Sequence, residues 1–346
     1  MIRIEAPTYP IFIGRGLLGR AAELLPEGPH HLVTDENVLA EGWPDRLGLA
    51  LASRHVLPPG EANKTLAIVT RLADALLDAG ISRGDFVVAL GGGMVGDVAG
   101  FAAAILKRGC GLIQMPTTLL GQADSAIGGK TGVNTRHGKN LLGAFHQPSA
   151  VLIDVDTLDT LPQHELTAGY AEVVKYGLIG DAGFFAWCEA HGAALIAGDA
   201  EARLHAVEAS VRAKLAAVTG DERDTRGRRA LLNFGHSFGH AIESETGLPH
   251  GEAVAIGMAM AFRLSAARDL CPADDARRVE AHLRSAGLPA RLPPANPDAL
   301  LARMAQDKKS GSGGTRLVLA RGIGHAFLAD DVSTNELANF LTAEAG

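Results

Sequence analysis

Residues 85–100 of this chain read DFVVALGGGMVGDVAG: an apolar run, a row of three glycines and the start of an alanine-rich segment. The apolar run, 85–90, is rich in β-branched residues and predicts a buried strand. The glycines predict a tight turn, and the alanine-rich segment predicts a helix. In such a unit the first N–H groups of the helix point to one spot, and the positive end of the helix dipole favours an anion there. We therefore predict that this turn binds a pyrophosphate.

Three of these glycines, Gly91, Gly93 and Gly96, have the G-x-G-x-x-G spacing of dinucleotide-binding turns. The alternative is a glycine turn that only allows close packing. One feature departs from the fingerprint. Pro116 stands where a ribose-binding acid is expected, and its neighbours are uncharged. Contacts with the ribose or the adenine must therefore come from another part of the chain.

The composition narrows the class of protein. The chain has 346 residues, of which 47% are hydrophobic, 5% aromatic and 21% charged, and its net charge is −7. This length allows two domains, and the negative charge argues against a protein that binds nucleic acid or acidic membranes. The longest apolar run, 86–106, contains Asp97 and five glycines, so we interpret it as strand, turn and helix rather than as a membrane span.

Cysteine use and the first residues predict a cytoplasmic protein. Cys110, Cys188 and Cys271 are scattered and lack C-x-x-C spacing, so we expect reduced thiols. The N-terminal segment has no basic stretch followed by an apolar core, so we expect no signal peptide.

The first half of the chain alternates between predicted strands and predicted helices. The strands are 2–4, 10–13, 31–35, 54–57, 85–90, 111–115 and 150–154, and the helices include 17–25, 37–50 and 65–79. This alternation predicts an α/β domain with a largely parallel sheet, which binds ligands at the carboxyl ends of its strands. Four polar residues lie at or just beyond such ends: Asp35, Glu61, Thr117 and Thr118.

Residues 121–147 break the alternation. They form a long glycine-rich stretch that carries Asp124, Lys130 and Asn134 at intervals. Long irregular segments within compact domains are usually functional or disordered, and the apolar residues here argue against disorder. We predict an irregular connection that forms the floor of a site.

Helical patterns dominate after residue 162, so we place a domain boundary there: 1–160 as the α/β domain and 161–346 as a mainly helical domain. The predicted helices are 163–178, 181–196, 200–219, 228–246, 250–270 and 273–286. Residues 316–320 and 325–328 predict two paired strands. Ser333 and Glu336 form a capping box for a final helix.

Three histidines and one glutamate predict a metal site in the helical half. His236 and His240 are four residues apart and share one face of a helix. Position 237 is serine, which disfavours a zinc protease of the H-E-x-x-H type. Glu172 lies on an otherwise apolar helix and needs a partner. Two histidines and a carboxylate form a common catalytic zinc site. Spacing alone favours His236 and His240 as ligands and leaves the role of His250 open.

Charged residues near these segments predict a cradle for an anionic substrate. The cations are Arg108, Lys130, Lys139, Lys175, Lys214, Arg229, Lys308 and Lys309. Together in one cleft they would hold a phosphate and a carboxylate, although each alone also fits a solvated surface charge. Glu61 and Asp97 are candidates for contacts with a ribose, and Asp124 for orienting Lys130 or a substrate hydroxyl; the alternative is that they are exposed loop acids. The residues thus predict a nicotinamide site facing a metal and an anion cradle, a combination suited to hydride transfer.

Taken together, nine motifs resemble the 3-dehydroquinate synthase family of sugar-phosphate cyclases. They are 59–64, 91–97, 116–120, 124–134, 139–145, 171–177, 232–243, 250–258 and 307–309, and they span nearly the whole chain in the order of the family. One departure is the segment between Ile242 and His250, which is a few residues shorter than the family pattern. It puts the geometry of this turn in question, but not the identity of the ligands.

The resemblance implies a Rossmann-like NAD-binding domain followed by a helical metal- and substrate-binding domain, as a homodimer. It implies zinc or cobalt held by Glu172, His236 and His250, in place of the pair that spacing favoured, with His240 in proton transfer and phosphate binding. The implied NAD contacts are Asp35, Glu61, Lys64, Gly92, Gly93, Gly96, Asp97, Thr117, Thr118, Asp124, Lys130, Lys139, Thr157 and Thr160. The implied substrate contacts are Arg108, Lys130, Asn140, Lys175, Lys214, Arg229, Asn233, Lys308 and Lys309.

The reaction implied is the conversion of 3-deoxy-D-arabino-heptulosonate 7-phosphate to 3-dehydroquinate and phosphate. Its steps are transient oxidation by NAD, phosphate elimination, re-reduction, ring opening and aldol closure. The alternatives are a sister cyclase of the valiolone or scyllo-inosose synthase type, a metal-dependent polyol dehydrogenase, and a non-catalytic NAD-binding regulator. A regulator would have lost a metal ligand or part of the lysine cradle, and this chain keeps them all.

Overall fold

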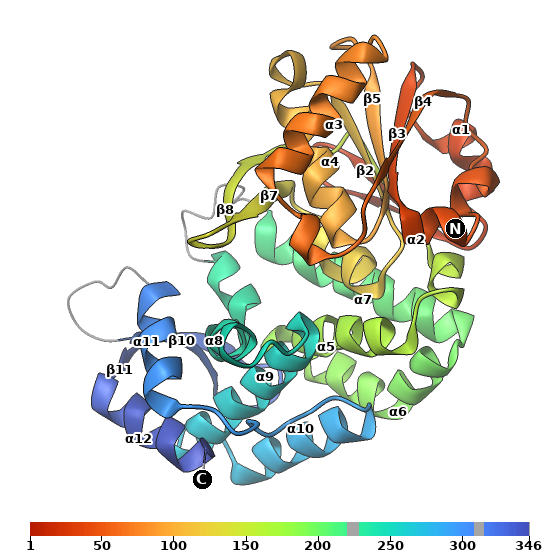
Figure 1. The fold of residues 1–346 in the computed structure, drawn as a ribbon. Coiled ribbons are helices and arrows are strands. Elements are labelled where there is room, and N and C mark those ends of the chain that lie inside the picture. The colour runs from red at the N-terminus through yellow and green to blue at the C-terminus, as the bar shows by residue number, and fades with distance from the viewer. Residues whose placement is uncertain (220–227, 308–314, 346) are drawn as a thin grey trace. The chain divides into compact units, whose positions relative to one another are not determined.

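The computed structural model describes residues 1–219, 228–307 and 315–345 (Figure 1). The chain divides into two compact units. Unit 1 comprises Met1–Leu166 and Arg203–Leu215, and unit 2 comprises Thr167–Ala202 and Ala216–Gly346. Unit 1 therefore includes a short segment, 203–215, that interrupts unit 2 in the sequence. Among the described residues, no helix has the length and apolar character that a membrane span requires.

Unit 1 is built on a seven-stranded sheet with the strand order β1-β2-β9-β6-β5-β3-β4. The strands are β1 (Ile2–Glu5), β2 (Pro10–Gly14), β3 (His30–Asp35), β4 (Leu51–Leu57), β5 (Phe86–Gly91), β6 (Gly111–Pro116) and β9 (Ala150–Asp154). β1 and β2 are antiparallel, and all other neighbouring strands are parallel. The predicted α/β class is confirmed.

The packing of β5 explains the apolar run at residues 85–90. Val87 and Ala89 pack into one core with α3 (Leu66–Asp78) and α4 (Gly93–Ile105). Val88 and Leu90 pack into a second core on the opposite face, together with residues from α1 (Ala21–Leu24). Figure 1 shows α3 and α4 on one side of β5 and α1 on the other. A strand that is buried on both faces needs apolar residues at every position.

The predicted helix 37–50 is wrong in its continuity. The structure has α2 (Glu36–Ala40), a separate 3₁₀ turn, η2 (Trp43–Arg46), and a non-helical stretch before β4. Gly42 separates the two helical pieces with a φ of 73°, a left-handed conformation that favours glycine. Pro44 follows and has no N–H for a continuing helix.

The predicted irregular connection 121–147 is also wrong, because most of it is regular. One π-helical turn, Gly121–Ser125, precedes an antiparallel hairpin of β7 (Lys130–Thr135) and β8 (Gly138–Phe145). The glycines that suggested a loop allow the two strands to approach, since a Cβ at Gly143 would lie 2.0 Å from the carbonyl oxygen of Thr131. Val133 of β7 packs into the same core as α4, so the hairpin lies against the helix that follows the glycine turn.

The C-terminal half is mainly helical, as predicted. Its described elements are α5 (Gln163–Gly180), α6 (Ala182–Ala197), α7 (Ala200–Val218), η7 (Arg228–Asn233), α8 (His236–Thr246), α9 (His250–Ala267), α10 (Ala273–Ser285), α11 (Pro297–Asp307), β10 (Thr315–Ala320), β11 (Ala326–Val332) and α12 (Thr334–Ala345). The predicted helix 228–246 is broken at Gly235, whose φ is 79°. β10 and β11 pair as predicted.

The capping box is half confirmed. The Ser333 hydroxyl accepts a hydrogen bond of 3.2 Å from the backbone N–H of Glu336, as an N-terminal cap requires. The Glu336 carboxylate, however, pairs with Arg268 at 3.0 Å.

The three cysteines are free and buried, and we expect them to be unreactive in the native protein. Burial raises the pKa of Cys110 and of Cys271 to about 11, and that of Cys188 to about 12. Thiolates are the reactive form, so almost none is present at pH 8. Titration with an aromatic disulfide reagent should detect no fast-reacting thiol in the folded protein and three in denaturant. A fast-reacting thiol in the folded protein would contradict this.

Candidate metal and dinucleotide sites

Three residues of unit 2 form a compact group of metal-ligand atoms. Glu172 on α5 is fully buried, and His236 and His250 are the first residues of α8 and α9. Nε2 of His236 lies 3.4 Å from Oε1 of Glu172, and Nε2 of His250 lies 3.8 Å from the same oxygen. All three ligand atoms lie within 4.8 Å of one another. The chemistry fits a divalent cation of the zinc or cobalt type, because two imidazoles and one carboxylate leave a further position open.

Both histidines have an oxygen partner at Nδ1 that fixes the orientation of the ring. Nδ1 of His236 donates to the carbonyl oxygen of Phe234 at 3.1 Å, which leaves the Nε2 lone pair directed at the group. Nδ1 of His250 lies 3.2 Å from Oε2 of Glu243. Burial lowers the pKa of His236 to about 3, so this imidazole is neutral near pH 7 and able to bind a metal. An outer acceptor on Nδ1 is typical of histidines that bind metals through Nε2.

The ligand pair that spacing favoured is therefore wrong in one member. His240 is exposed, its ring centre lies 5.4 Å from that of His236, and it is not part of the three-residue group. The four-residue spacing does bring the two rings together, but the remaining ligands come from α5 and α9. The set implied by the family resemblance, Glu172, His236 and His250, is confirmed.

Glycines allow the helices that carry these ligands to pack closely. A Cβ at Gly251, next to His250, would lie 2.0 Å from the carbonyl oxygen of Ala168 on α5. A Cβ at Gly257 on α9 would lie 2.1 Å from the carbonyl oxygen of Gly235, the residue before His236. The short distance between the ligands thus depends on backbone contacts that no larger residue allows.

Lys175 lies one turn after Glu172 on α5 and forms an ion pair with it. Both side chains are almost completely buried. A buried carboxylate next to a cation remains charged far more readily than an isolated one, which suits a metal ligand.

The remaining predicted substrate residues of unit 2 occupy different environments. Arg229 is buried in η7, whereas Asn233, at the end of η7, is exposed. Lys308 and Lys309 lie outside the described residues.

In unit 1, the glycine turn between β5 and α4 has the predicted form. α4 begins at Gly93, and its N-cap residue Gly92 has no side chain to occupy the first N–H groups. The packing alternative is also correct in part. A Cβ would lie 3.0 Å from Thr118 Cγ2 at Gly92, 3.2 Å from Ser125 Oγ at Gly93, and 2.8 Å from Gln114 Oε1 at Gly96. These glycines therefore allow close packing as well as an open helix N-terminus, where an anion is favoured.

Three predicted dinucleotide residues meet beside the first turns of α4. Lys64 is 5% exposed and forms an ion pair with Asp97, and its Nζ lies 3.9 Å from Oε1 of Glu61. Burial raises the pKa of Asp97, and the neighbouring Lys64 acts in the opposite direction. Asp97 was a candidate for contact with a ribose, but in this structure Lys64 neutralises its charge.

Other predicted residues of this site help to hold the local structure. Asp35 accepts a hydrogen bond of 2.9 Å from the N–H of Val38 and caps α2, while burial raises its pKa. Thr118 accepts from the N–H of Gly121 at 3.1 Å, and Thr117 is buried.

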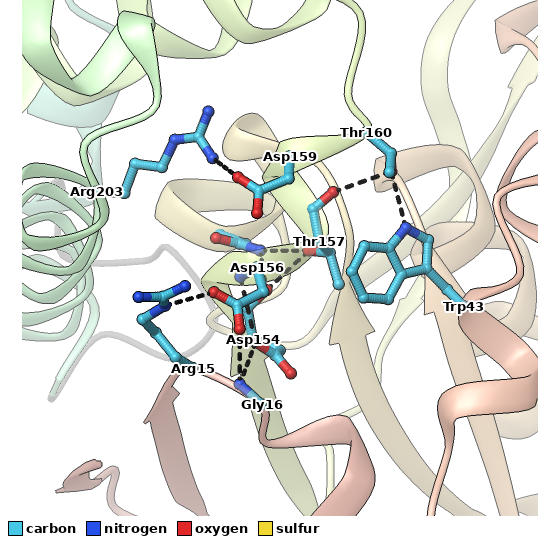
Figure 2. A network of polar contacts seen from close by, with 10 residues as sticks. Arg15, Gly16, Trp43, Asp154, Asp156, Thr157, Asp159, Thr160 and Arg203 are labelled. Atoms are coloured by element: carbon cyan, nitrogen blue, oxygen red, sulfur yellow. Dashed lines mark hydrogen bonds and ion pairs between the residues drawn. The ribbon is translucent and has the colours of Figure 1, made fainter.

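Figure 2 shows Thr157 and Thr160 within a network of polar contacts. The Thr157 hydroxyl donates to the carbonyl oxygen of Asp154 at 2.8 Å, and the Thr160 hydroxyl accepts from Nε1 of Trp43 at 2.8 Å. Arg203, from α7, pairs with Asp159 at 2.6 Å (Figure 2). The turn 154–160 is thereby fixed from β9, η2 and α7.

Of the predicted cations in unit 1, one forms an ion pair with an acid of the same unit, and the others are exposed. Lys214 of α7 pairs with Oδ1 of Asp124 at 2.8 Å. Lys130 and Lys139 are exposed on the hairpin of β7 and β8. Arg108 is exposed in a strained turn and has a φ of 65°, and Asn140 of β8 has a φ of 54°.

Sequence reasoning missed the supporting role of two residues. Glu243 orients His250, and Asn134 bonds to both Glu61 and Asn140. Both residues lie within motifs quoted above. Glu243 is seven positions before His250, and only the turn between α8 and α9 brings them together, so spacing carries no signal for it.

Comparison with known proteins identifies a family. The model of the 3-dehydroquinate synthase N-terminal part matches residues 54–168, and that of the C-terminal part matches 169–310. The 3-dehydroquinate synthase of Rhodospirillum rubrum is 54% identical, covering 97% of this chain and 92% of the relative. That of Zymomonas mobilis is 50% identical, covering 96% and 93%.

Solved structures share the fold over the full length. A 2-epi-5-epi-valiolone synthase from Streptomyces hygroscopicus with NAD⁺ and Zn²⁺ bound is 33% identical, with a TM-score of 0.90 and coverage of 100% of this chain and 99% of that one. A 2-deoxy-scyllo-inosose synthase with carbaglucose-6-phosphate, NAD⁺ and Co²⁺ is 25% identical, with a TM-score of 0.88 and coverage of 99% and 100%. Together with the matches to both family models, these relatives establish that the chain belongs to the 3-dehydroquinate synthase family.

Proposed function

We propose that this chain converts 3-deoxy-D-arabino-heptulosonate 7-phosphate to 3-dehydroquinate and phosphate, a step of the shikimate pathway towards chorismate and the aromatic amino acids. The observation that carries the proposal is the compact group of buried Glu172 and half-buried His236 and His250, with both imidazoles oriented. It occurs in a chain that is about half identical, over nearly its whole length, to 3-dehydroquinate synthases.

We assign the two cofactors to the two parts of the chain. Residues 1–160 form the NAD-binding domain, and residues 161–346 hold a zinc or cobalt ion and the substrate. The open N-terminus of α4 and the acids and threonines around it support the first assignment. The compact ligand group supports the second. The valiolone synthase holds NAD⁺ and Zn²⁺, and the inosose synthase holds NAD⁺ and Co²⁺, which supports the pairing of these two kinds of cofactor.

When bound, NAD supplies a transient oxidation and the divalent ion supplies a Lewis acid for the substrate oxygens. The residues of the chain bind and orient the ligands and transfer protons. Glu172, His236 and His250 hold the ion, and His240, exposed beside them, moves a proton and contacts the phosphate. We assign the substrate phosphate and carboxylate to a set of cations and amides, namely Arg108, Lys130, Asn140, Lys175, Lys214, Arg229, Asn233, Lys308 and Lys309. Such groups bind anions by charge-assisted hydrogen bonds, and fixed geometry favours the aldol closure.

The second candidate is a sister cyclase, because the valiolone synthase has a TM-score of 0.90 to this chain. Its identity of 33%, against 54% for a 3-dehydroquinate synthase, favours the first function. A polyol dehydrogenase is the weaker alternative. A probable glycerol dehydrogenase from Sinorhizobium meliloti is 19% identical with a TM-score of 0.66, which shows a shared fold alone.

We also propose a cytoplasmic homodimer. Three buried free thiols are consistent with a reducing compartment. Leu141, Leu142 and Phe145 expose apolar side chains on β8, with exposed fractions of 61%, 45% and 52%, and contact with a second copy would cover them. Sedimentation of the purified protein tests the dimer, and a monomer at micromolar concentration would contradict it.

Turnover by the purified, metal-loaded protein tests the function. Phosphate release from the heptulosonate phosphate is followed together with NADH absorbance at catalytic amounts of NAD. We expect many phosphates per NAD and no accumulation of NADH, because the oxidation is reversed within each turnover. Accumulating NADH would indicate a dehydrogenase. Turnover only with sedoheptulose 7-phosphate or glucose 6-phosphate would indicate a sister cyclase.

A further inference from the structure

We infer that Asn134 is a positioning residue that fixes the Glu61 carboxylate and the Asn140 backbone relative to each other. The inference rests on the proposed function, in which Glu61 contacts NAD and Asn140 contacts the substrate. Asn134 itself is assigned to neither ligand. It is half-buried near the end of β7, and all its contacts described here lie within unit 1.

The backbone of Asn134 joins two segments that are far apart in the sequence. Its N–H donates to the carbonyl oxygen of Lys64 at 2.9 Å, and it forms a parallel bridge with Thr65. Lys64 belongs to the loop that carries Glu61, and Asn134 belongs to the hairpin that carries Lys139 and Asn140. The loop and the hairpin are therefore in fixed register at this residue.

The side chain of Asn134 uses both ends of its amide. Nδ2 donates to Oε1 of Glu61 at 2.8 Å, and Oδ1 accepts from the backbone N–H of Asn140 at 3.0 Å. Only a short side chain with a donor and an acceptor makes both bonds. Aspartate has the same shape but no donor at neutral pH, and alanine has neither group.

Each of the two bonds holds a group that needs support. The cation Lys64 lies 3.9 Å from Glu61, but it is already paired with Asp97. The Glu61 side chain is 46% exposed, so without Asn134 it would rotate into solvent. Asn140 has a φ of 54° within a strand, a conformation that costs free energy and persists only where neighbouring contacts enforce it.

The two bonds can be separated by substitution. Asn134→Asp keeps the acceptor for Asn140 and loses the donor to Glu61, so we expect NAD⁺ to bind about tenfold more weakly. The KM for the heptulosonate phosphate at saturating NAD⁺ should stay within about twofold of the wild type. Asn134→Ala loses both bonds, so we expect the dissociation constant of NAD⁺ and the KM for the heptulosonate phosphate to rise and kcat to fall. NAD⁺ affinity is measured by calorimetry on the metal-loaded protein, independently of turnover.

A double-mutant cycle distinguishes positioning from general damage. In the Glu61→Gln background, the new amide can donate to the introduced carboxylate at position 134, so Asn134→Asp should weaken NAD⁺ binding less than it does in the wild type. Asn296→Asp is the matched control. Asn296 accepts from the N–H of Asp298 at 3.0 Å at the start of α11 in unit 2, and aspartate also caps a helix, so NAD⁺ affinity should not change.

Two results would overturn the inference. One is an Asn134→Ala protein with wild-type NAD⁺ affinity and substrate KM. The other is an Asn134→Asp effect on NAD⁺ binding that is the same in both Glu61 backgrounds. If Asn134→Ala does not fold, the Asp variant and its cycle decide the question. A wild-type protein that binds no NAD⁺ would instead contradict the proposed function, which keeps the two failures apart.

Discussion

Glu172→Gln is expected to lower kcat by about a thousandfold and to abolish tight binding of the divalent ion. Glutamine has the shape of glutamate but no negative charge, and the group at Glu172, His236 and His250 then keeps only its two imidazoles as ligands, beside the cationic Lys175. A buried lysine without its carboxylate is also destabilising, so the metal-free variant should lose about 3 kcal/mol of unfolding free energy.

Metal content after gel filtration, phosphate release and denaturant unfolding measure the three effects separately. Glu245→Gln is the matched control, because Glu245 lies on α8 in the same unit but pairs with Arg303 at 2.9 Å. It should retain metal and activity. Glu243→Gln should have an intermediate effect on metal affinity, about 10- to 100-fold, since this residue orients His250 and is not itself in the ligand group. A Glu172→Gln protein with full metal content and turnover would disprove the metal assignment.

Gly251→Ala is expected to destabilise the protein by about 3 kcal/mol and to weaken metal binding by more than about tenfold. The added methyl group would lie 2.0 Å from the carbonyl oxygen of Ala168, which is backbone and cannot rotate away. α9 would have to move from α5, and His250, the residue before Gly251, would move from Glu172.

Gly180→Ala is the control for this substitution. Gly180 is the last residue of α5, and a Cβ there meets nothing within 4 Å. The alanine should be neutral or stabilising by about 0.5 kcal/mol, because it restricts the unfolded chain. Equal unfolding free energies and metal affinities for the two variants would show that the approach of α5 and α9 does not determine the site.

The sequence alone predicted the elements whose patterns are local. The strand, glycine turn and helix at 85–105 are found as β5 and α4. They could be predicted because a strand buried on both faces is apolar throughout and an open helix N-terminus is rich in glycine. The hairpin of β7 and β8 was missed. Its glycines serve a close approach between two backbones, and the same composition is typical of a loop.

The metal site shows the same division. His236 and His240 were joined by helical spacing, a local rule, and only one of them belongs to the ligand group. Glu172 and His250 come from other helices, so their association with His236 depends on the tertiary structure. The residue patterns offered Glu172 as a ligand and left His250 open, and only the resemblance to a family selected the final set. The orientation of His250 by Glu243 depends on the turn between two helices and left no pattern in the sequence.

The return of residues 203–215 to unit 1 has a consequence for the order in which the protein folds during translation. Domains generally fold as units, with the N-terminal one first. Unit 1 is not complete when residue 166 has been synthesised, because Asp124 and Asp159 still lack Lys214 and Arg203. The ribosome must first make α6, which belongs to unit 2, before α7 supplies both cations. A nascent chain that is halted between these points should therefore be sensitive to protease around 154–160, and protection there should appear only after residue 215 has emerged.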